Sequence, residues 1–233
     1  MEDFKPLVII PTYNEALNIK FIINEIFKTC PDINILIVDD NSPDGTAEIV
    51  HQMLDKRIYI LKRTKKQGLA SAYIEGFKKG IDLGFNRFIQ MDADFSHKPE
   101  YLPLMLENLK KYDFVIGSRN IKGGGVQNWS FFRNLISKAG SLYSKIILFC
   151  PINDLTGGFN GWRKEVLEGI NLNNIISLGY SFQIELKYKA YKKGFKYIEF
   201  PIIFPDRKYG ESKMSKDIFF EALKNVVKIR FSK

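Results

Sequence analysis

Two aspartates separated by one small residue stand in the middle of the chain, directly after a largely apolar run. The run begins at Phe88 and leads into Asp92, Ala93 and Asp94. Because side chains alternate along an extended segment, we expect Asp92 and Asp94 to point to the same side, where two carboxylates repel unless a cation or a proton lies between them. Mg²⁺ and Mn²⁺ favour oxygen ligands of this kind, commonly one or two carboxylates together with the phosphates of a substrate. A solvated turn rich in aspartate is the alternative interpretation of so short a motif.

The elements that must position this pair alternate regularly in the first half of the chain. Apolar runs rich in β-branched residues indicate strands, and the segments between them place apolar residues at helical spacing. The predicted strands cover residues 7–10, 33–38, 58–61, a run from 88 that carries Asp92, and 114–119; the predicted helices cover 16–28, 46–54, 69–79 and 99–111. This alternation predicts an α/β fold with a mainly parallel, twisted sheet and helices on both of its faces.

Polar clusters follow four of the predicted strands at the points where the strands end. The clusters are residues 11–15, 39–40, 92–94 and 118–119. Ligands bind beyond the carboxyl ends of the strands in such sheets, so we expect the four clusters to form one site. In a nucleotide site, Asp92 and Asp94 would hold the metal, and Glu15 and Asp40 would meet base or sugar hydroxyls.

The carboxylates away from the central pair also have structural interpretations. Glu15 suits the first turn of a helix, where the macrodipole favours an acid. Asp39 and Asp40 suit an acidic pocket of the receiver-domain type, although that pocket normally closes within a much shorter chain. Tyr13 and Trp162 suit either stacking on a base or sugar, or packing in the core. The glycine patterns of phosphate loops and dinucleotide folds are absent after the first predicted strand, which disfavours both classes.

The second half of the chain is less regular and carries clustered cations. We expect a glycine loop at 122–126, a helix at 131–149, a turn-rich segment at 154–159 that returns to the sheet, a helix at 181–193, an edge strand at 197–204 interrupted by Pro201, and a basic amphipathic helix at 219–231. Arg119 and Arg133 flank the glycine loop, and Arg207, Lys208 and Lys213 surround Gly210. Each cation alone suits a solvated surface, but together they suit a second phosphate opposite a metal diphosphate.

Composition narrows the classes of partner. The 233 residues, 45% of them hydrophobic, can form a large core, and the net charge of +9 favours an anionic partner. No nucleic-acid motif accompanies the charge, so we expect no nucleic acid as partner. Two cysteines and no secretory signal predict reduced thiols in the cytoplasm. No apolar run approaches the roughly 20 residues that cross a bilayer, so we expect no transmembrane segment.

Seven segments together resemble the motifs of a known family. They are, in order, Pro11–Glu15 (PTYNE), Val38–Thr46 (VDDNSPDGT), Gly68–Tyr73 (GLASAY), Met91–His97 (MDADFSH), Gly117–Arg119 (GSR), Asp154–Phe159 (DLTGGF) and Asp206–Lys213 (DRKYGESK). Their order resembles that of the dolichol-phosphate (polyprenol-phosphate) mannose synthases, which are inverting GT-A glycosyltransferases of family 2. The likeness extends from about Leu7 to about Lys213, nearly the whole chain.

The resemblance implies a role for each matching residue. The guanosine of GDP-mannose would be held by Pro11, Tyr13, Glu15, Val38 and Asp40. Mg²⁺ or Mn²⁺ would be bound by Asp92 and Asp94, with Ala93 against the nucleotide. The lipid phosphate would be held by Arg119 and Arg133, and the donor by Arg207 and Lys213 from a closing loop. Ser96 departs from some relatives, which carry glutamine there. Because serine is shorter, Ser96 would reach the metal through a water molecule.

The resemblance also implies an organisation and a place of work. Residues 1–213 would form a single GT-A (Rossmann-like) domain, with a nucleotide-sugar half at about 7–120 and an acceptor half at about 121–213, followed by the basic helix within 214–233. Such an enzyme transfers mannose with inversion to dolichyl or polyprenyl phosphate, giving a β-linked product. It would lie peripherally on the cytoplasmic face of a membrane, through the basic helix on anionic lipid or through a membrane-anchored partner subunit. The helix alternatively packs on the catalytic domain.

Two other functions remain open at this point. A polyprenyl-phosphate glucosyltransferase that uses UDP-glucose would share the fold and most motifs, although the segment Asp206–Lys213 resembles the mannose branch. A non-enzymatic, nucleotide-binding regulatory module would leave the paired aspartates and the loop arginines without a task.

Overall fold

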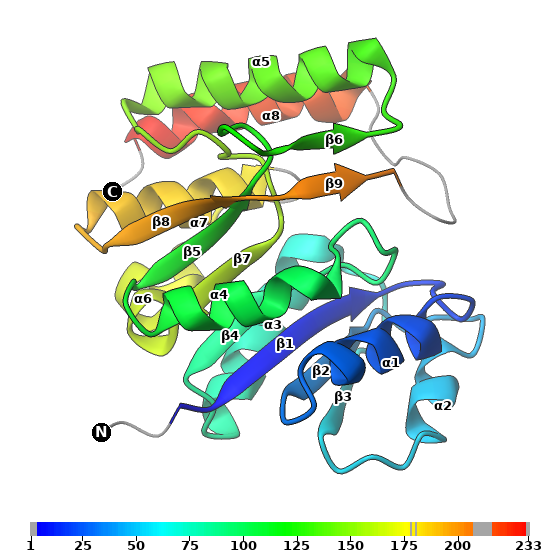
Figure 1. Cartoon of the computed structure of the whole chain (residues 1–233). Coiled ribbons are helices and arrows are strands. Elements are labelled where there is room, and N and C mark those ends of the chain that lie inside the picture. The colour runs from blue at the N-terminus through cyan, green and yellow to red at the C-terminus, as the bar shows by residue number, and fades with distance from the viewer. Residues whose placement is uncertain (1–3, 178, 180, 207–215, 232–233) are drawn as a thin grey trace.

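The computed structural model describes residues 4–177, 179, 181–206 and 216–231 (Figure 1). The strands are β1 (Pro6–Thr12), β2 (Asn34–Asp39), β3 (Ile58–Lys62), β4 (Arg87–Gln90), β5 (Phe114–Ser118), β6 (Gly125–Gln127), β7 (Asn160–Arg163), β8 (Tyr197–Pro201) and β9 (Ile203–Pro205). The α-helices are α1 (Ile19–Thr29), α2 (Thr46–His51), α3 (Leu69–Asp82), α4 (Leu102–Leu109), α5 (Phe131–Leu148), α6 (Lys164–Ile170), α7 (Ser181–Lys192) and α8 (Lys216–Phe231). Short 3₁₀ turns at Pro99–Tyr101 and Leu172–Asn174 precede α4 and follow α6.

One large sheet and one strand pair organise the described residues. The seven strands of the large sheet have the order β3-β2-β1-β4-β7-β5-β8, and β6 pairs with β9 separately. All pairs in the large sheet are parallel except those that β7 makes with β4 and β5. The mainly parallel sheet predicted from the alternation of elements is therefore confirmed, with β7 as its one reversed strand among the described residues.

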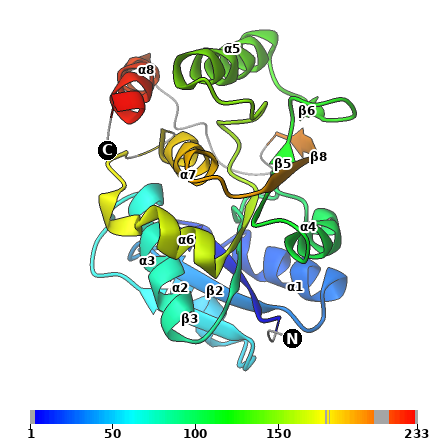
Figure 2. The ribbon, with the colours of Figure 1, turned by 90° about the vertical axis from the view of Figure 1, so that its left-hand side faces the viewer.

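Helices cover both faces of this sheet, with α3 and α6 on one side and α1 and α4 on the other (Figure 2). Successive side chains of β1 point to opposite faces of the sheet, so this one strand contributes to the core on each face. Leu7 and Ile9 are buried in the core that contains Phe77 of α3, whereas Val8 and Ile10 are buried in the core that contains α1. Each face therefore has its own apolar core.

Two glycines allow α3 to lie close against β1. A Cβ atom at Gly76 would lie 2.7 Å from a methyl carbon of Ile9, and one at Gly80 would lie 2.6 Å from a methyl carbon of Leu7. The two glycines are four residues apart and so share one face of the helix. This close approach fixes the start of α3 beside the carboxyl ends of the central strands.

Several predicted boundaries differ from the structure because local pairing decides where strands end. β4 ends at Gln90, so Asp92 lies in the turn after the strand and not on the strand itself. α2 ends at His51, before the predicted Leu54. The predicted glycine loop contributes β6, and the predicted strand at 197–204 is divided into β8 and β9, because β9 leaves the large sheet to pair with β6.

The helices α5 and α8 lie side by side at one end of the molecule (Figures 1 and 2). Val226 and Ile229 of α8 are fully buried in the same core as Leu148 of α5. One face of the basic terminal helix therefore packs on the rest of the fold, as the alternative interpretation of its pattern predicted. None of the helices in the described part of the chain is both long and apolar enough to cross a membrane.

Candidate active site

The first two strands bring the predicted nucleoside-binding residues together. Pro11 on β1 lies beside Val38 on β2 in the parallel register, and Thr12 lies beside Asp39. The Asp40 backbone N–H donates to the Thr12 carbonyl at 2.9 Å. The ends of β1 and β2 thus place Pro11, Val38 and Asp40 at one point on the rim of the sheet.

Asp40 is buried and already holds the loop that follows β3. Its carboxylate accepts hydrogen bonds from the Arg63 guanidinium and from the backbone N–H groups of Gln67 and Gly68, the latter at 2.9 Å. Arg63 is buried as well and also donates to Ser71 on α3. The Asp40 carboxylate therefore orders residues 63–68 around the predicted nucleoside site.

Tyr13 and Glu15 lie in the turn between β1 and α1. The Lys66 ammonium lies 3.8 Å from the centre of the Tyr13 ring, which is within the range of a cation–π contact. The Glu15 carboxylate accepts from the Asn18 side chain at 2.8 Å, and its backbone N–H donates to Thr46 Oγ1 at 3.0 Å. α1 begins only at Ile19, so Glu15 precedes the helix instead of occupying its first turn.

The paired aspartates sit in a tight turn directly after β4, where Phe95 has a φ of 64°. The Asp92 backbone N–H donates to His97 Nδ1 at 2.9 Å, and Asp92 Oδ1 accepts from the Tyr73 hydroxyl at 3.2 Å. Ser96 donates both its backbone N–H, at 3.0 Å, and its hydroxyl to Asp94 Oδ1. Ser96 therefore orients Asp94 from within the turn.

Both carboxylates lie close to the hydroxyl of Tyr73. Burial, followed by the charges of Asp92 and Asp94, raises the pKa of Tyr73 well above its usual value. The hydroxyl consequently stays protonated and acts as a donor. Asp92 keeps a third of its side chain exposed, whereas Asp94 is buried.

The donor set fits a hard divalent cation that shares its coordination with a substrate. Among the described residues, no three His, Cys, Asp or Glu side chains gather as a self-contained metal site. Two carboxylate groups in one turn leave most coordination positions to other oxygens, such as those of a diphosphate. Zinc would require nitrogen or sulfur ligands instead.

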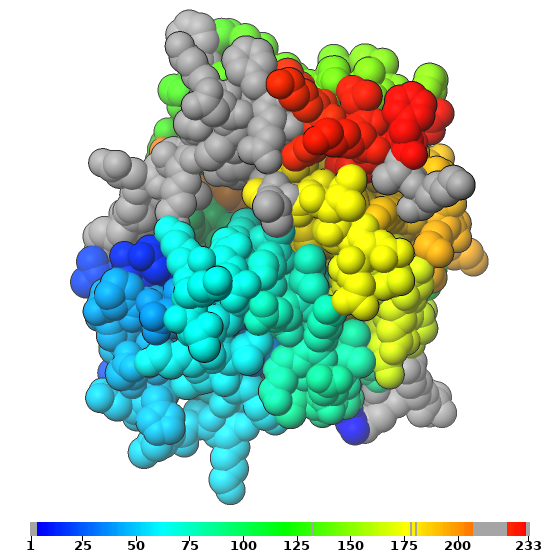
Figure 3. Space-filling view, turned by 180° about the vertical axis from the view of Figure 1, so that it is seen from behind, coloured from blue at the N-terminus to red at the C-terminus, as the bar shows by residue number. Residues whose placement is uncertain are grey.

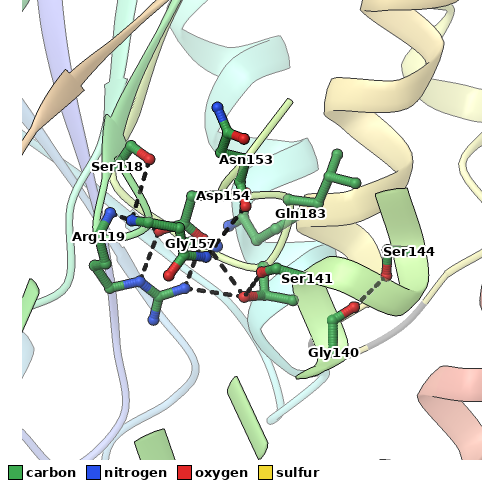
Figure 4. Close-up of polar contacts among 12 residues, drawn as sticks. Ser118, Arg119, Gly140, Ser141, Ser144, Asn153, Asp154, Gly157 and Gln183 are labelled. Atoms are coloured by element: carbon green, nitrogen blue, oxygen red, sulfur yellow. Dashed lines mark hydrogen bonds and ion pairs between the residues drawn. The ribbon is translucent and has the colours of Figure 1, made fainter. Parts of the chain in front are cut away.

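Arg119, at the end of β5, is fixed by a buried ion pair (Figure 4). Its Nε and Nη2 atoms donate to the two carboxylate oxygens of Asp154 at 2.8 and 2.7 Å, and Nη2 also donates to Thr156 at 2.9 Å. Burial alone would raise the pKa of Asp154, but the charge and hydrogen bonds of Arg119 hold it well below its usual value. The bidentate geometry gives the guanidinium a single orientation.

A buried lysine supports the same turn, and the sequence analysis did not find it. Lys187 of α7 donates to the carbonyls of Asp154, Leu155 and Gly157 at 2.8, 3.2 and 2.6 Å. Burial lowers the pKa of Lys187 to about 8, although the charge of Asp154 opposes this change. The only sequence signal is its place among apolar residues on α7, which shows neither the burial nor the three carbonyl partners.

Arg133 lies in the first turn of α5 and is held by two contacts. It donates to Asp206 at 2.6 Å, and its guanidinium carbon lies 4.0 Å from the centre of the Trp129 ring. Phe204 of β9 meets Trp129 edge-on at 5.5 Å and His97 edge-on at 5.4 Å between ring centres. The rings of His97, Phe204 and Trp129 thus connect the aspartate turn with the two arginines.

The other residues predicted for the site lie within the aspartate turn, in the core or outside the described residues. Ala93 is buried within the aspartate turn. Arg207 and Lys213 lie outside the described residues. Trp162 is a fully buried core residue whose indole N–H donates to Gln90 at 2.9 Å, so the core interpretation holds for it. Arg63, Lys187 and Trp129 are the site residues that the sequence analysis missed.

Comparison with known proteins assigns this arrangement to a family. The family model described as Glycosyl transferase family 2 matches residues 7–170. The chain is 42% identical over 224 residues to the Undecaprenyl-phosphate mannosyltransferase of Micrococcus luteus, covering 95% of this chain and 92% of that one. It is also 42% identical over 223 residues to the Polyprenol monophosphomannose synthase of Mycolicibacterium smegmatis, covering 94% and 84%.

A solved structure supports the fold. The mannosyltransferase PcManGT from Pyrobaculum calidifontis, in complex with GDP-Man and Mn²⁺, superposes with a TM-score of 0.62 over 97% of this chain and 72% of that one. The sequence identity is 17%, so this likeness concerns the GT-A fold alone.

Proposed function

The chain belongs to glycosyl transferase family 2, and we propose that it transfers mannose from GDP-mannose to a dolichyl or polyprenyl phosphate with inversion at the anomeric carbon. The names of its relatives at 42% identity support this reaction class. One observation in the structure carries the proposal furthest: the rings of His97, Phe204 and Trp129 bring the aspartate turn next to Arg119 and Arg133. A metal-diphosphate donor and an anionic acceptor would meet at that junction.

On the donor side, Asp92 and Asp94 would hold Mg²⁺ or Mn²⁺ on the diphosphate, with Ser96 keeping Asp94 in place. The cation, when bound, would neutralise the charge that develops on the departing GDP. Pro11, Tyr13, Glu15, Val38 and Asp40 would surround the guanosine. Ala93 would touch the nucleotide, and Arg207 and Lys213 would hold the donor from the segment after β9.

On the acceptor side, Arg119 and Arg133 would hold the lipid phosphate. A phosphate monoester oxygen is already anionic near neutral pH, so the acceptor needs no protein group to remove a proton before attack. The task of the protein is to align this oxygen with the anomeric carbon on the face opposite the diphosphate. Attack from that face converts an α-linked donor into a β-linked lipid phosphate mannose.

A panel of donors tests the proposal against its nearest alternative. Purified protein would be incubated with undecaprenyl phosphate, Mn²⁺ and one of GDP-mannose, UDP-glucose or UDP-N-acetylglucosamine. We expect a lipid-linked sugar from GDP-mannose alone. A product from UDP-glucose and none from GDP-mannose would replace the proposal with the glucosyltransferase, and no product from any donor would contradict both.

We further propose that the face of α5 turned away from the domain lies on an anionic bilayer. Leu135, Leu142, Ile146 and Phe149 expose 53%, 58%, 60% and 75% of their surfaces, although they are large and apolar. The spacing of Leu135, Leu142 and Ile146 places them along one side of the helix, with exposed Lys138 between them, and Phe149 follows directly after the helix. Such an apolar stripe with flanking cations suits the interface between lipid head groups and acyl chains.

The charges beside the stripe favour anionic lipid over a second copy of the chain. The α5 segment, residues 131–149, carries three cations and no acidic residue, and the second half of α8 beside it carries Lys224, Lys228 and Arg230. Seen from behind, α8 and α5 occupy the same end of the molecule (Figure 3). Two copies meeting through this face would bring like charges together, whereas anionic lipid attracts them. This face also begins next to Arg133, where a lipid-borne phosphate would arrive.

Sedimentation with vesicles that contain phosphatidylglycerol tests this face. The double variant Leu142→Gln/Ile146→Gln removes apolar surface without removing core volume, and we expect it to lose most of the binding. The control Phe21→Gln/Leu104→Gln changes exposed residues on α1 and α4 and should bind as the unmodified protein does. Equal binding by both variants would contradict the assignment of this face, and no binding by the unmodified protein would favour a membrane-anchored partner.

A further inference from the structure

Trp129 lies close to both arginines of the proposed acceptor side. It precedes α5 in the chain, two residues after β6. The guanidinium carbons of Arg133 and Arg119 lie 4.0 and 5.8 Å from its ring centre, and Phe204 packs edge-on against the ring. The indole thus helps to hold both guanidinium groups in place through its π face.

The indole N–H is the feature that packing does not explain. Nε1 of Trp129 is buried, and it has no hydrogen-bond partner among the described residues. Buried indole donors normally have an acceptor, as the corresponding atom of Trp162 does. A donor without an acceptor among the described residues, beside two cations, suits an anionic ligand.

We propose that Trp129 belongs to the acceptor site, where its indole N–H donates to a phosphate oxygen of the lipid acceptor while its ring positions Arg119 and Arg133. This inference rests on the proposed function and adds a residue to it. A phosphate monoester has three terminal oxygens, enough to accept from both guanidinium groups and from the indole. An arriving phosphate would compete with the half-exposed Asp206 for Arg133.

Arg119 and Arg133 form ion pairs with Asp154 and Asp206, respectively, so the charge of each arginine is already neutralised by a carboxylate. A neutral donor therefore adds binding energy for the phosphate without adding a charge that would need its own partner. The ring also contacts both guanidinium groups, so that it helps to hold them where a phosphate would meet them. These two tasks need an aromatic ring with an N–H, which only tryptophan combines at this size.

The variant Trp129→Phe separates the two tasks, because it keeps an aromatic face and removes the donor. We expect the KM for undecaprenyl phosphate to rise about tenfold, as fits the loss of a hydrogen bond to a charged group, while kcat and the KM for GDP-mannose change less than about twofold. Trp129→Leu, which also removes the ring, should raise the acceptor KM further. A purely structural role would instead lower kcat or change both KM values together.

Fluorescence gives a readout that does not depend on turnover, because the chain has only two tryptophans. Titration with farnesyl monophosphate should change the emission of the unmodified protein and of Trp162→Phe, in which Trp129 is the only indole. The emission of Trp129→Phe should not respond. Trp162→Phe also serves as the matched control for KM, because it removes an indole that lies in the core.

Different results would exclude the proposed function and the role of Trp129. Should the unmodified protein make no lipid-linked mannose, the proposed function fails. Should it make the product while Trp129→Phe keeps the acceptor KM within about twofold, the function stands and the role of Trp129 is wrong. An unchanged emission of Trp162→Phe with saturating farnesyl monophosphate would likewise overturn it.

Discussion

Tyr73→Phe should weaken metal binding without disturbing the fold. Tyr73 is fully buried and stacks between Phe77 and Phe182, with ring centres 6.1 and 6.2 Å away. Phenylalanine fills the same space and keeps both contacts, so the change removes only the hydroxyl that donates to Asp92 Oδ1 at 3.2 Å. The experiment therefore isolates one hydrogen bond to a proposed metal ligand.

The expected size follows from two considerations. Residues that hydrogen-bond to metal ligands typically change metal affinity by about 10- to 100-fold when they are replaced. The bond from Tyr73 is long for an O–H donor, which places the effect at the lower end. We expect the dissociation constant for Mn²⁺ to rise about tenfold, equivalent to about 1.4 kcal/mol.

Electron paramagnetic resonance of free Mn²⁺, in the presence of GDP-mannose, measures this constant directly. The Mn²⁺ concentration for half-maximal activity should rise in parallel, with the maximal rate within about threefold of the unmodified protein, since excess metal restores occupancy. Tyr143→Phe is the matched control, because it removes a hydroxyl that donates to the Leu223 carbonyl at 3.3 Å between α5 and α8. Equal Mn²⁺ affinity in Tyr73→Phe and Tyr143→Phe would refute the role of the Tyr73 hydroxyl.

Three further changes probe the metal turn and the buried supports of Arg119. Asp94→Ala should abolish mannose transfer while the circular dichroism spectrum stays unchanged, because it removes a proposed metal ligand and little core volume; metal-dependent turnover at the normal rate would contradict the assignment. Asp154→Asn should lower the free energy of unfolding in urea by about 3 kcal/mol, because it leaves the buried Arg119 guanidinium without its counter-charge; a loss below about 1 kcal/mol would count against the ion pair as a support of the site. Burial lowers the pKa of Lys187 to about 8, from 10.5 in the unfolded chain, so between these two pH values the unfolded chain binds more protons than the folded protein. The free energy of unfolding should therefore rise with pH in this range, and Lys187→Met should lack this rise. Parallel pH profiles for the two proteins would show that Lys187 does not titrate in this way.

The sequence was sufficient for the features that depend on local pattern. The β-branched runs and the helical spacing located the strands and helices of the first half, because each apolar run had to be buried in a sheet covered on both faces. The rule that ligands bind at the carboxyl ends of parallel strands then placed Pro11, Asp40, Asp92 and Arg119 on one rim. β1 pairs in parallel with both β2 and β4, and Asp92 follows the end of β4 by two residues, which agrees with that placement.

The features that the sequence did not predict depend on partners distant in the chain. β6 is three residues long and exists because β9 leaves the large sheet to pair with it. Lys187 reads as a solvated lysine until three carbonyls of a turn some 30 residues earlier surround its ammonium group. Trp129 contacts Arg133, four residues further along the chain, but also Arg119 and Phe204, which distant segments supply.

Two polar residues of the site show that residue type and motif position alone do not predict every contact that a side chain makes. Asp40 matches the motif of a nucleoside ligand, yet its carboxylate also orders the loop that contains Gln67 and Gly68. Ser96 is predicted to act on the metal through water, and in the structure its hydroxyl donates to the carboxylate of Asp94, the neighbouring proposed ligand. In both cases a polar side chain beside the site shapes the backbone or the carboxylate that would meet the substrate.

The product of the proposed mannosyl transfer provides its sharpest test. Purified protein would be incubated with GDP-mannose, Mn²⁺ and undecaprenyl phosphate, and the lipid fraction would be analysed by mass spectrometry and NMR. The account predicts undecaprenyl phosphate mannose with a β anomeric linkage, formed only when the divalent cation is present. An α-linked product, or free mannose with no lipid-linked sugar, would contradict it.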